Sequence, residues 1–226
     1  GGYDEAFGLL SGKILSDPSG LRNDFYLRLI DSFEDKLTDL KAYSNLLVKA
    51  SAFSGLAAMY LSSRYYIRGD RTGMAGLRGR LNIVTNFLAV APFPNEDGRG
   101  HETAFPPENE LVFTNYYQGK VRPIGWRQVF ANPFGRLKAD NFFRPYQEAT
   151  GYFCVFLRSE TAQSGLVKLA INTPFKLWVN GSPCRFDDAK HAFVIDQYSI
   201  PVSLGSGWNV LLLKSSSPDQ EEWKFL

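Results

Sequence analysis

The hydrophobic residues of the chain change their spacing once, near Arg80, and this change limits the folds open to it. Over residues 3–80, apolar side chains recur every three or four positions, as on one face of an α-helix. Beyond residue 80 they alternate with polar side chains in short runs separated by Gly, Pro and Asn, which is typical of β-strands. The sequence therefore predicts two parts in the order α then β. We expect a helical domain over residues 1–82 and an antiparallel β-sandwich over residues 83–226.

Two long helices are predicted in the first part. The first carries a stripe of apolar residues at steps of four, which we expect to be buried: Leu21, Phe25, Leu29, Phe33 and Leu37. The second covers residues 51–68. Gly69 then supplies a helix stop, and Asp70 supplies the N-cap of a short third helix around Ala75.

The second part divides into short strands with turns between them. Strands are predicted over residues 87–95, 121–130, 150–159, 166–171, 175–179, 191–197, 198–204 and 210–214. The strongest single signal is Asn180-Gly181, because both positions of a type I′ turn need a positive φ. We therefore expect a β-hairpin there that fixes the register of the sandwich.

Charge and hydropathy exclude some partners. The net charge of the 226 residues is +2, which creates no strong field toward nucleic acid or an anionic membrane surface. No apolar run approaches the roughly 20 residues of a membrane span, so no membrane insertion is expected. The chain starts with Gly1-Gly2 and stops within a strand-like run, which indicates a fragment of a longer protein.

The sequence contains no convincing catalytic or zinc-binding set. The two histidines, His101 and His191, and the two cysteines, Cys154 and Cys184, lack the spacing of a zinc site. The cysteines suit either a disulfide or two buried thiols, and spacing alone leaves both open. Adjacent acidic pairs are typical of solvated turns, and no serine lies in a Gly-x-Ser-x-Gly elbow. We predict that the chain is not an enzyme.

Aromatic residues are the best ligand-binding candidates, because aromatic planes stack on the apolar faces of sugar rings. Tyr116 and Tyr117 lie in a polar segment that suits the surface. Trp126 is a third candidate, although the favoured interpretation places both Trp126 and Trp208 in the core of the sandwich.

Two sets of residues resemble known families. Ala57, Ala58, Tyr65, Gly69-Asp70 and Ala75 follow the helix–turn–helix pattern of tetratricopeptide-type repeats. Residues 177–181, 198–204 and 207–214 resemble the galactose-binding-like jelly-roll accessory domains of glycoside hydrolases. With residues 90–100, 105–108 and 125–126, this order resembles a module of large bacterial tetratricopeptide-repeat proteins, over roughly residues 55–226.

The resemblance implies a non-catalytic interaction module of a larger extracytoplasmic, periplasmic or cell-surface bacterial protein. Its helical part would bind another protein or domain. The alternative is a carbohydrate-binding accessory module that recognises a polysaccharide through loop aromatics. Structural calcium is common in this fold class, and Glu96, Asp97 and Glu102 share one loop that could hold it.

Overall fold

The chain forms two compact units, Gly1–Ile83 and Val84–Leu226. The structure is a computed structural model that describes residues 2–18, 22–217 and 222–226. The first unit is helical and the second is built on an antiparallel sheet, which confirms the predicted order of α then β. Leu21 of the predicted stripe lies outside the described residues.

Five α-helices make up the described part of the first unit: α1 (Gly2–Ser16), α2 (Asn23–Asp31), α3 (Leu40–Ala50), α4 (Gly55–Ile67) and α5 (Arg71–Leu81). Helix α4 contacts α2, α3 and α5, and α1 contacts α2 and α3. The predicted boundary between α4 and α5 is confirmed. Gly69 has a φ of 66°, and the Asp70 carboxylate accepts a hydrogen bond of 2.8 Å from the Gly73 amide as the N-cap of α5.

The predicted stripe is wrong for α2 (Asn23–Asp31), because its members Phe25 and Leu29 are exposed. Phe33 and Leu37 are buried as predicted, but they lie beyond the end of the helix. The side chains that α2 buries are instead Asn23, Leu27 and Ile30, none of which belongs to the stripe. Phe25 is consequently 62% exposed.

The second unit is built around a six-stranded antiparallel sheet with the order β4-β1-β6-β11-β8-β9. Its strands are β1 (Asn86–Pro94), β4 (Arg127–Phe130), β6 (Ala149–Ser159), β8 (Phe175–Val179), β9 (Ser182–Asp187) and β11 (Gly207–Ser217). The predicted hairpin is confirmed. Asn180 and Gly181 have φ values of 51° and 78° and join β8 to β9.

Smaller pieces cover one face of this sheet. Strand β7 (Gln163–Leu169) pairs with β10 (Tyr198–Leu204), and β5 (Leu137–Lys138) pairs with β12 (Lys224–Phe225). The core between them and the sheet includes Phe153, Phe175 and Trp223. The strand predicted over residues 191–197 is wrong, since this segment is a loop with one turn.

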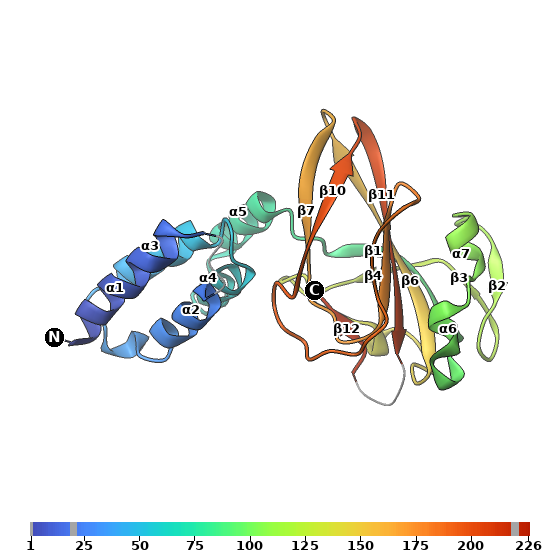
Figure 1. Cartoon of the computed structure of the whole chain (residues 1–226), viewed down its shortest axis with the longest axis horizontal. Coiled ribbons are helices and arrows are strands. Elements are labelled where there is room, and N and C mark those ends of the chain that lie inside the picture. The colour runs from blue at the N-terminus through green and yellow to red at the C-terminus, as the bar shows by residue number, and fades with distance from the viewer. Residues whose placement is uncertain (1, 19–21, 218–221) are drawn as a thin grey trace. The chain divides into compact units, whose positions relative to one another are not determined.

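The opposite face of the sheet is covered by residues 95–126, which we call the cap. The cap contains α6 (Arg99–Glu102), α7 (Pro106–Asn109), β2 (Tyr116–Gln118) and β3 (Pro123–Gly125). In Figure 1 these elements lie together on one side of the sheet, and β7, β10 and β12 lie on the other. A second cluster of buried side chains fills the space between cap and sheet: Val90, Phe93, Tyr117, Ile124, Tyr152, Cys154 and Leu212.

Both cysteines are free thiols. Cys154 is buried between the sheet and the cap, and this burial raises the pKa of its thiol to about 12. A thiol held in its neutral form by burial is a poor nucleophile and a poor metal ligand.

Candidate functional site

Strand alternation decides which side chains face the cap. Along β8, Phe175, Leu177 and Val179 belong to the main core, so Lys176 and Trp178 point to the other face. Strand β11 lies beside β8 and pairs Leu212 with Trp178 and Lys214 with Lys176. The cap-facing side of the sheet therefore has an apolar end around Trp178 and a polar end around Lys214.

Lys214 is the centre of the polar end. Its side chain is fully buried, and its Nζ donates to Glu108 Oε1 and to the Thr103 carbonyl, both at 2.7 Å. Tyr152 Oη donates to the same Glu108 oxygen at 2.5 Å. Burial lowers the pKa of Lys214, and the nearby Glu108 carboxylate opposes this shift. The three groups tie α7 of the cap to β6 and β11.

His101 lies next to this network, on α6. Its Nδ1 is 3.3 Å from Ser216 Oγ, and its Nε2 is 3.0 Å from Asp188 Oδ1. Burial lowers the pKa of His101, against a weaker opposite effect of the hydrogen bond to Asp188. Gly100 allows the close approach of α6 to the sheet, since a Cβ there would lie 2.1 Å from the Pro94 carbonyl oxygen.

Ser216, His101 and Asp188 have the residue types of a hydrolase triad but not its accessibility. Ser216 is buried within β11, and its Oγ also lies 3.0 Å from Thr150 Oγ1. A nucleophilic serine must reach the substrate carbonyl. The arrangement therefore suits a structural hydrogen-bond chain, not acyl transfer.

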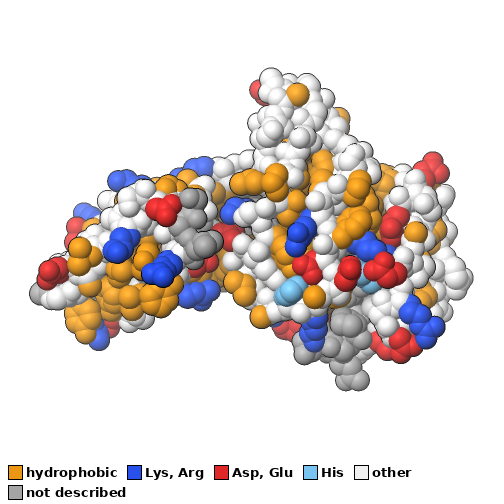
Figure 2. Space-filling model, viewed as in Figure 1, with side chains coloured by type: hydrophobic (Ala, Val, Ile, Leu, Met, Phe, Trp, Pro, Cys, Tyr) orange, Lys and Arg blue, Asp and Glu red, His pale blue; other side chains and the backbone are white. Residues whose placement is uncertain are grey.

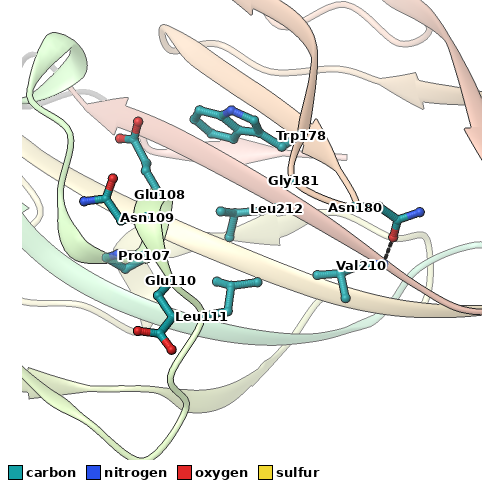
Figure 3. A pocket seen from close by; sticks show the side chains of 10 residues that line it. All are labelled: Pro107, Glu108, Asn109, Glu110, Leu111, Trp178, Asn180, Gly181, Val210 and Leu212. Carbon is teal, nitrogen blue, oxygen red and sulfur yellow. Dashed lines mark hydrogen bonds between the residues drawn. The ribbon is translucent and has the colours of Figure 1, made fainter.

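The apolar end carries a shallow pocket of about 230 Å³, which we call the Trp178 pocket. It is lined by Pro107, Glu108, Asn109, Glu110, Leu111, Trp178, Asn180, Gly181, Val210 and Leu212. Figure 3 shows the indole of Trp178 on one side of the pocket, Leu212 and Val210 beneath it, and the α7 residues opposite. The pocket thus combines an aromatic plane and apolar side chains with carboxylates and amides.

Three interactions hold the walls of this pocket. Phe186 of β9 packs against Trp178 with ring centroids 5.4 Å apart. Asn180 Oδ1 accepts a hydrogen bond of 2.9 Å from the Val210 amide, and its Nδ2 donates to Asn209 Oδ1 at 2.8 Å. The hairpin that fixes the sheet register therefore also positions one rim of the pocket.

The aromatic residues predicted to bind ligand come together in the cap. Tyr116 is 81% exposed on β2, whereas Tyr117 is only 9% exposed and donates to the Val112 carbonyl at 2.9 Å. Trp126 Nε1 lies 3.4 Å from the Tyr117 hydroxyl, and its ring packs against Phe113. Tyr117 also lines a second shallow depression, beside Asn109 and Glu110.

One tryptophan contradicts the sequence interpretation, and another is not among its ligand-binding candidates. Trp208, expected in the core, is 71% exposed near the start of β11. Trp178, within the residues 175–179 predicted as a strand, lines the pocket. The usable sequence signal was its position between the buried Leu177 and Val179, which places it on the second face of the sheet.

The three carboxylates proposed for calcium pair with three different cations. Glu96 lies 3.0 Å from Lys120, Asp97 lies 2.6 Å from Arg99, and Glu102 lies 3.1 Å from Lys176. The hydrogen bond from Lys120 lowers the pKa of Glu96.

No protein-family model matches the chain, and a search of curated proteins found no significant match. Within the described residues, no helix has the length and apolar character needed to cross a membrane.

Proposed function

We propose that the chain is a non-catalytic binding module and that its sheet unit binds a saccharide in the Trp178 pocket. The observation that carries this proposal is the indole of Trp178 near Glu108 and Asn109, over an apolar floor. The C–H face of a sugar ring stacks on an indole, and its hydroxyl groups bond to carboxylates and amides.

The size of the pocket indicates how much of the saccharide it contacts. At about 230 Å³ it lies below the roughly 300–1,000 Å³ of sites that enclose a drug-sized ligand. One sugar ring fits such a depression. The module would therefore recognise a single ring of a longer chain, with Tyr116 available on the neighbouring surface of the cap.

An affinity measurement with a matched control tests the proposal. The chain is screened on a glycan array, and hits are quantified by calorimetry for the unaltered protein, Trp178→Ala and Trp208→Ala. Trp208 is the control, because it is exposed and outside the residues that line the pocket. Trp178→Ala should weaken binding at least about tenfold, or about 1.4 kcal/mol, while Trp208→Ala should not. Equal losses in both variants, or no saccharide bound, would overturn the proposal.

The finer fold assignments belong to the same proposal. N-capped helices that contact their neighbours in the chain, α3 with α4 and α4 with α5, support the tetratricopeptide-like interpretation of the first unit. The two-sided packing of the antiparallel sheet supports the galactose-binding-like jelly roll. Together with the sequence resemblance they support a module of a larger extracytoplasmic bacterial protein.

A second candidate function is protein binding by the helical unit. Several of its hydrophobic side chains are exposed: Leu9, Phe25, Leu29, Tyr66 and Ile67. Figure 2 shows orange hydrophobic side chains gathered on the visible face of the helical unit. Exposed apolar groups gathered on one surface favour contact with another protein. A photo-crosslinking residue at Phe25 should capture a defined partner in expressing cells, while one at the exposed Lys168 of β7 should not. Identical capture patterns at both positions would contradict this function.

A further inference from the structure

Three potential metal ligands meet where α6 approaches the end of β9. His101 Nε2 lies 3.0 Å from Asp188 Oδ1 and 3.8 Å from Glu102 Oε1. The three ligand atoms all lie within 4.8 Å of one another. Asp188 is 87 residues from His101 in the sequence, so no local spacing reveals this cluster. Only the packing of the cap on the sheet brings the two segments together.

The imidazole is held in the orientation that a metal site requires. His101 is buried, and its Nδ1 lies 3.3 Å from Ser216 Oγ of β11. The His101 amide donates to Asn95 Oδ1 at 3.1 Å, which fixes the backbone of α6. Metal-bound histidines use one ring nitrogen for the metal and the other for such a hydrogen bond. The Nε2 atom is therefore the one presented to the carboxylates.

The two carboxylates are free to adjust around a bound ion. Asp188 and Glu102 are 75% and 70% exposed, so a shift of either side chain displaces no core packing. Lys176 Nζ holds Glu102 Oε2 at 3.1 Å, and the other oxygen, Oε1, faces His101. The second nearby cation, Lys214, is already neutralised by Glu108. One lysine beside two carboxylates leaves a net negative charge at the cluster.

We propose that His101 Nε2, Glu102 and Asp188 bind a divalent transition metal of the zinc type. Zinc bonds of about 2.0–2.2 Å to nitrogen and oxygen place neighbouring ligand atoms about 3.3–3.6 Å apart in a tetrahedron. The separations of 3.0 and 3.8 Å bracket this range. An imidazole ligand favours zinc over calcium, which prefers oxygen ligands alone.

A metal here links two parts of the sheet unit. Glu102 and His101 belong to the cap, and Asp188 directly follows β9, so the ion would fasten the edge of the sheet to α6. Three protein ligands also leave a fourth position open to water or to an oxygen of a bound molecule. The proposal is independent of saccharide binding in the Trp178 pocket.

Zinc titration of the whole chain tests the site. After treatment with a chelator, Zn²⁺ binding is followed by competition with a chromophoric chelator, and Ca²⁺ is titrated in parallel. We expect one Zn²⁺ per chain, a higher Tm with Zn²⁺, and no comparable effect of Ca²⁺. Asp188→Asn and Glu102→Gln should each weaken Zn²⁺ binding at least about tenfold.

The controls separate this site from adventitious binding and from misfolding. His191 lies 3.1 Å from Asp187 on the surface and offers a competing histidine–carboxylate pair, so His191→Ala should leave the affinity unchanged. Glu160→Gln controls for the loss of an exposed carboxylate. Both ligand variants alter exposed side chains and should keep the circular dichroism of the unaltered protein. Absence of zinc binding, or loss of it in His191→Ala but not in Asp188→Asn, would overturn the proposal.

Discussion

Replacing Lys214 with methionine should destabilise the sheet unit strongly, because this lysine is a buried charge with a buried partner. Its side chain is fully buried, and its Nζ donates two hydrogen bonds of 2.7 Å. Methionine fills the space of the aliphatic stem but leaves the Glu108 carboxylate, 15% exposed, without its cation. Removing one partner of a buried ion pair costs about 3–5 kcal/mol of unfolding free energy.

Urea unfolding followed by tryptophan fluorescence measures this loss. All four tryptophans lie in the sheet unit, so their emission reports this unit and not the helices. Lys168→Met removes an exposed lysine from β7 and should change stability by less than about 0.5 kcal/mol. In the double variant Lys214→Met/Glu108→Gln the orphaned charge is gone, so the loss should be smaller than the sum of the two single losses. If Lys214→Met lowers the unfolding free energy no more than Lys168→Met does, the network does not hold the cap on the sheet.

Two further predictions concern the hairpin and the C-terminal strand. Asn180→Ala should cost about 2–4 kcal/mol of unfolding free energy, because alanine is strained at a φ of 51° and both side-chain hydrogen bonds are lost. Asn180→Gly loses only the hydrogen bonds and should cost about 1–2 kcal/mol, so equal losses in urea unfolding would refute the role of the φ angle. Hydrogen bonds from Lys138 and Lys224 lower the pKa of Glu222 to about 2, which an NMR titration of its carboxyl carbon should show. The pKa of Glu222 is lower in the folded than in the unfolded chain. Its pairing with the two lysines therefore stabilises the fold above the ordinary carboxyl pKa of about 4.3, and this stabilisation is lost as the pH falls toward 2. Glu222 is half exposed, so this contribution should stay below about 1 kcal/mol; a midpoint near 4.3 would contradict the pairing.

Local sequence signals predicted much of this fold because they depend on near neighbours. The change of hydrophobic period near Arg80, the Gly69-Asp70 corner and the Asn180-Gly181 turn each act within a few residues, and the structure has them where they were expected. The prediction of a buried stripe through Phe25 was wrong, because it also used only the spacing of near neighbours. Periodicity alone does not show that α2 ends at Asp31.

The candidate site was harder to predict, because it depends on contacts between distant segments. Lys176 and Trp178 alternate with buried residues and therefore resemble the solvent-facing side of a strand. The cap covers that side, and no local sequence pattern shows which loop will cover a sheet. For the same reason the nearness of His101 to Asp188 could not be predicted from residue spacing.

The most direct test of the proposed function observes the indole of Trp178 itself. The chain has four tryptophans, so a ¹⁵N–¹H correlation spectrum contains four indole N–H signals, and the Trp178 signal is identified by its loss in Trp178→Phe. Titration with a saccharide found on the array should shift the Trp178 signal and leave the exposed Trp208 and the buried Trp223 in place. A saccharide that binds without moving the Trp178 signal would contradict binding in this pocket.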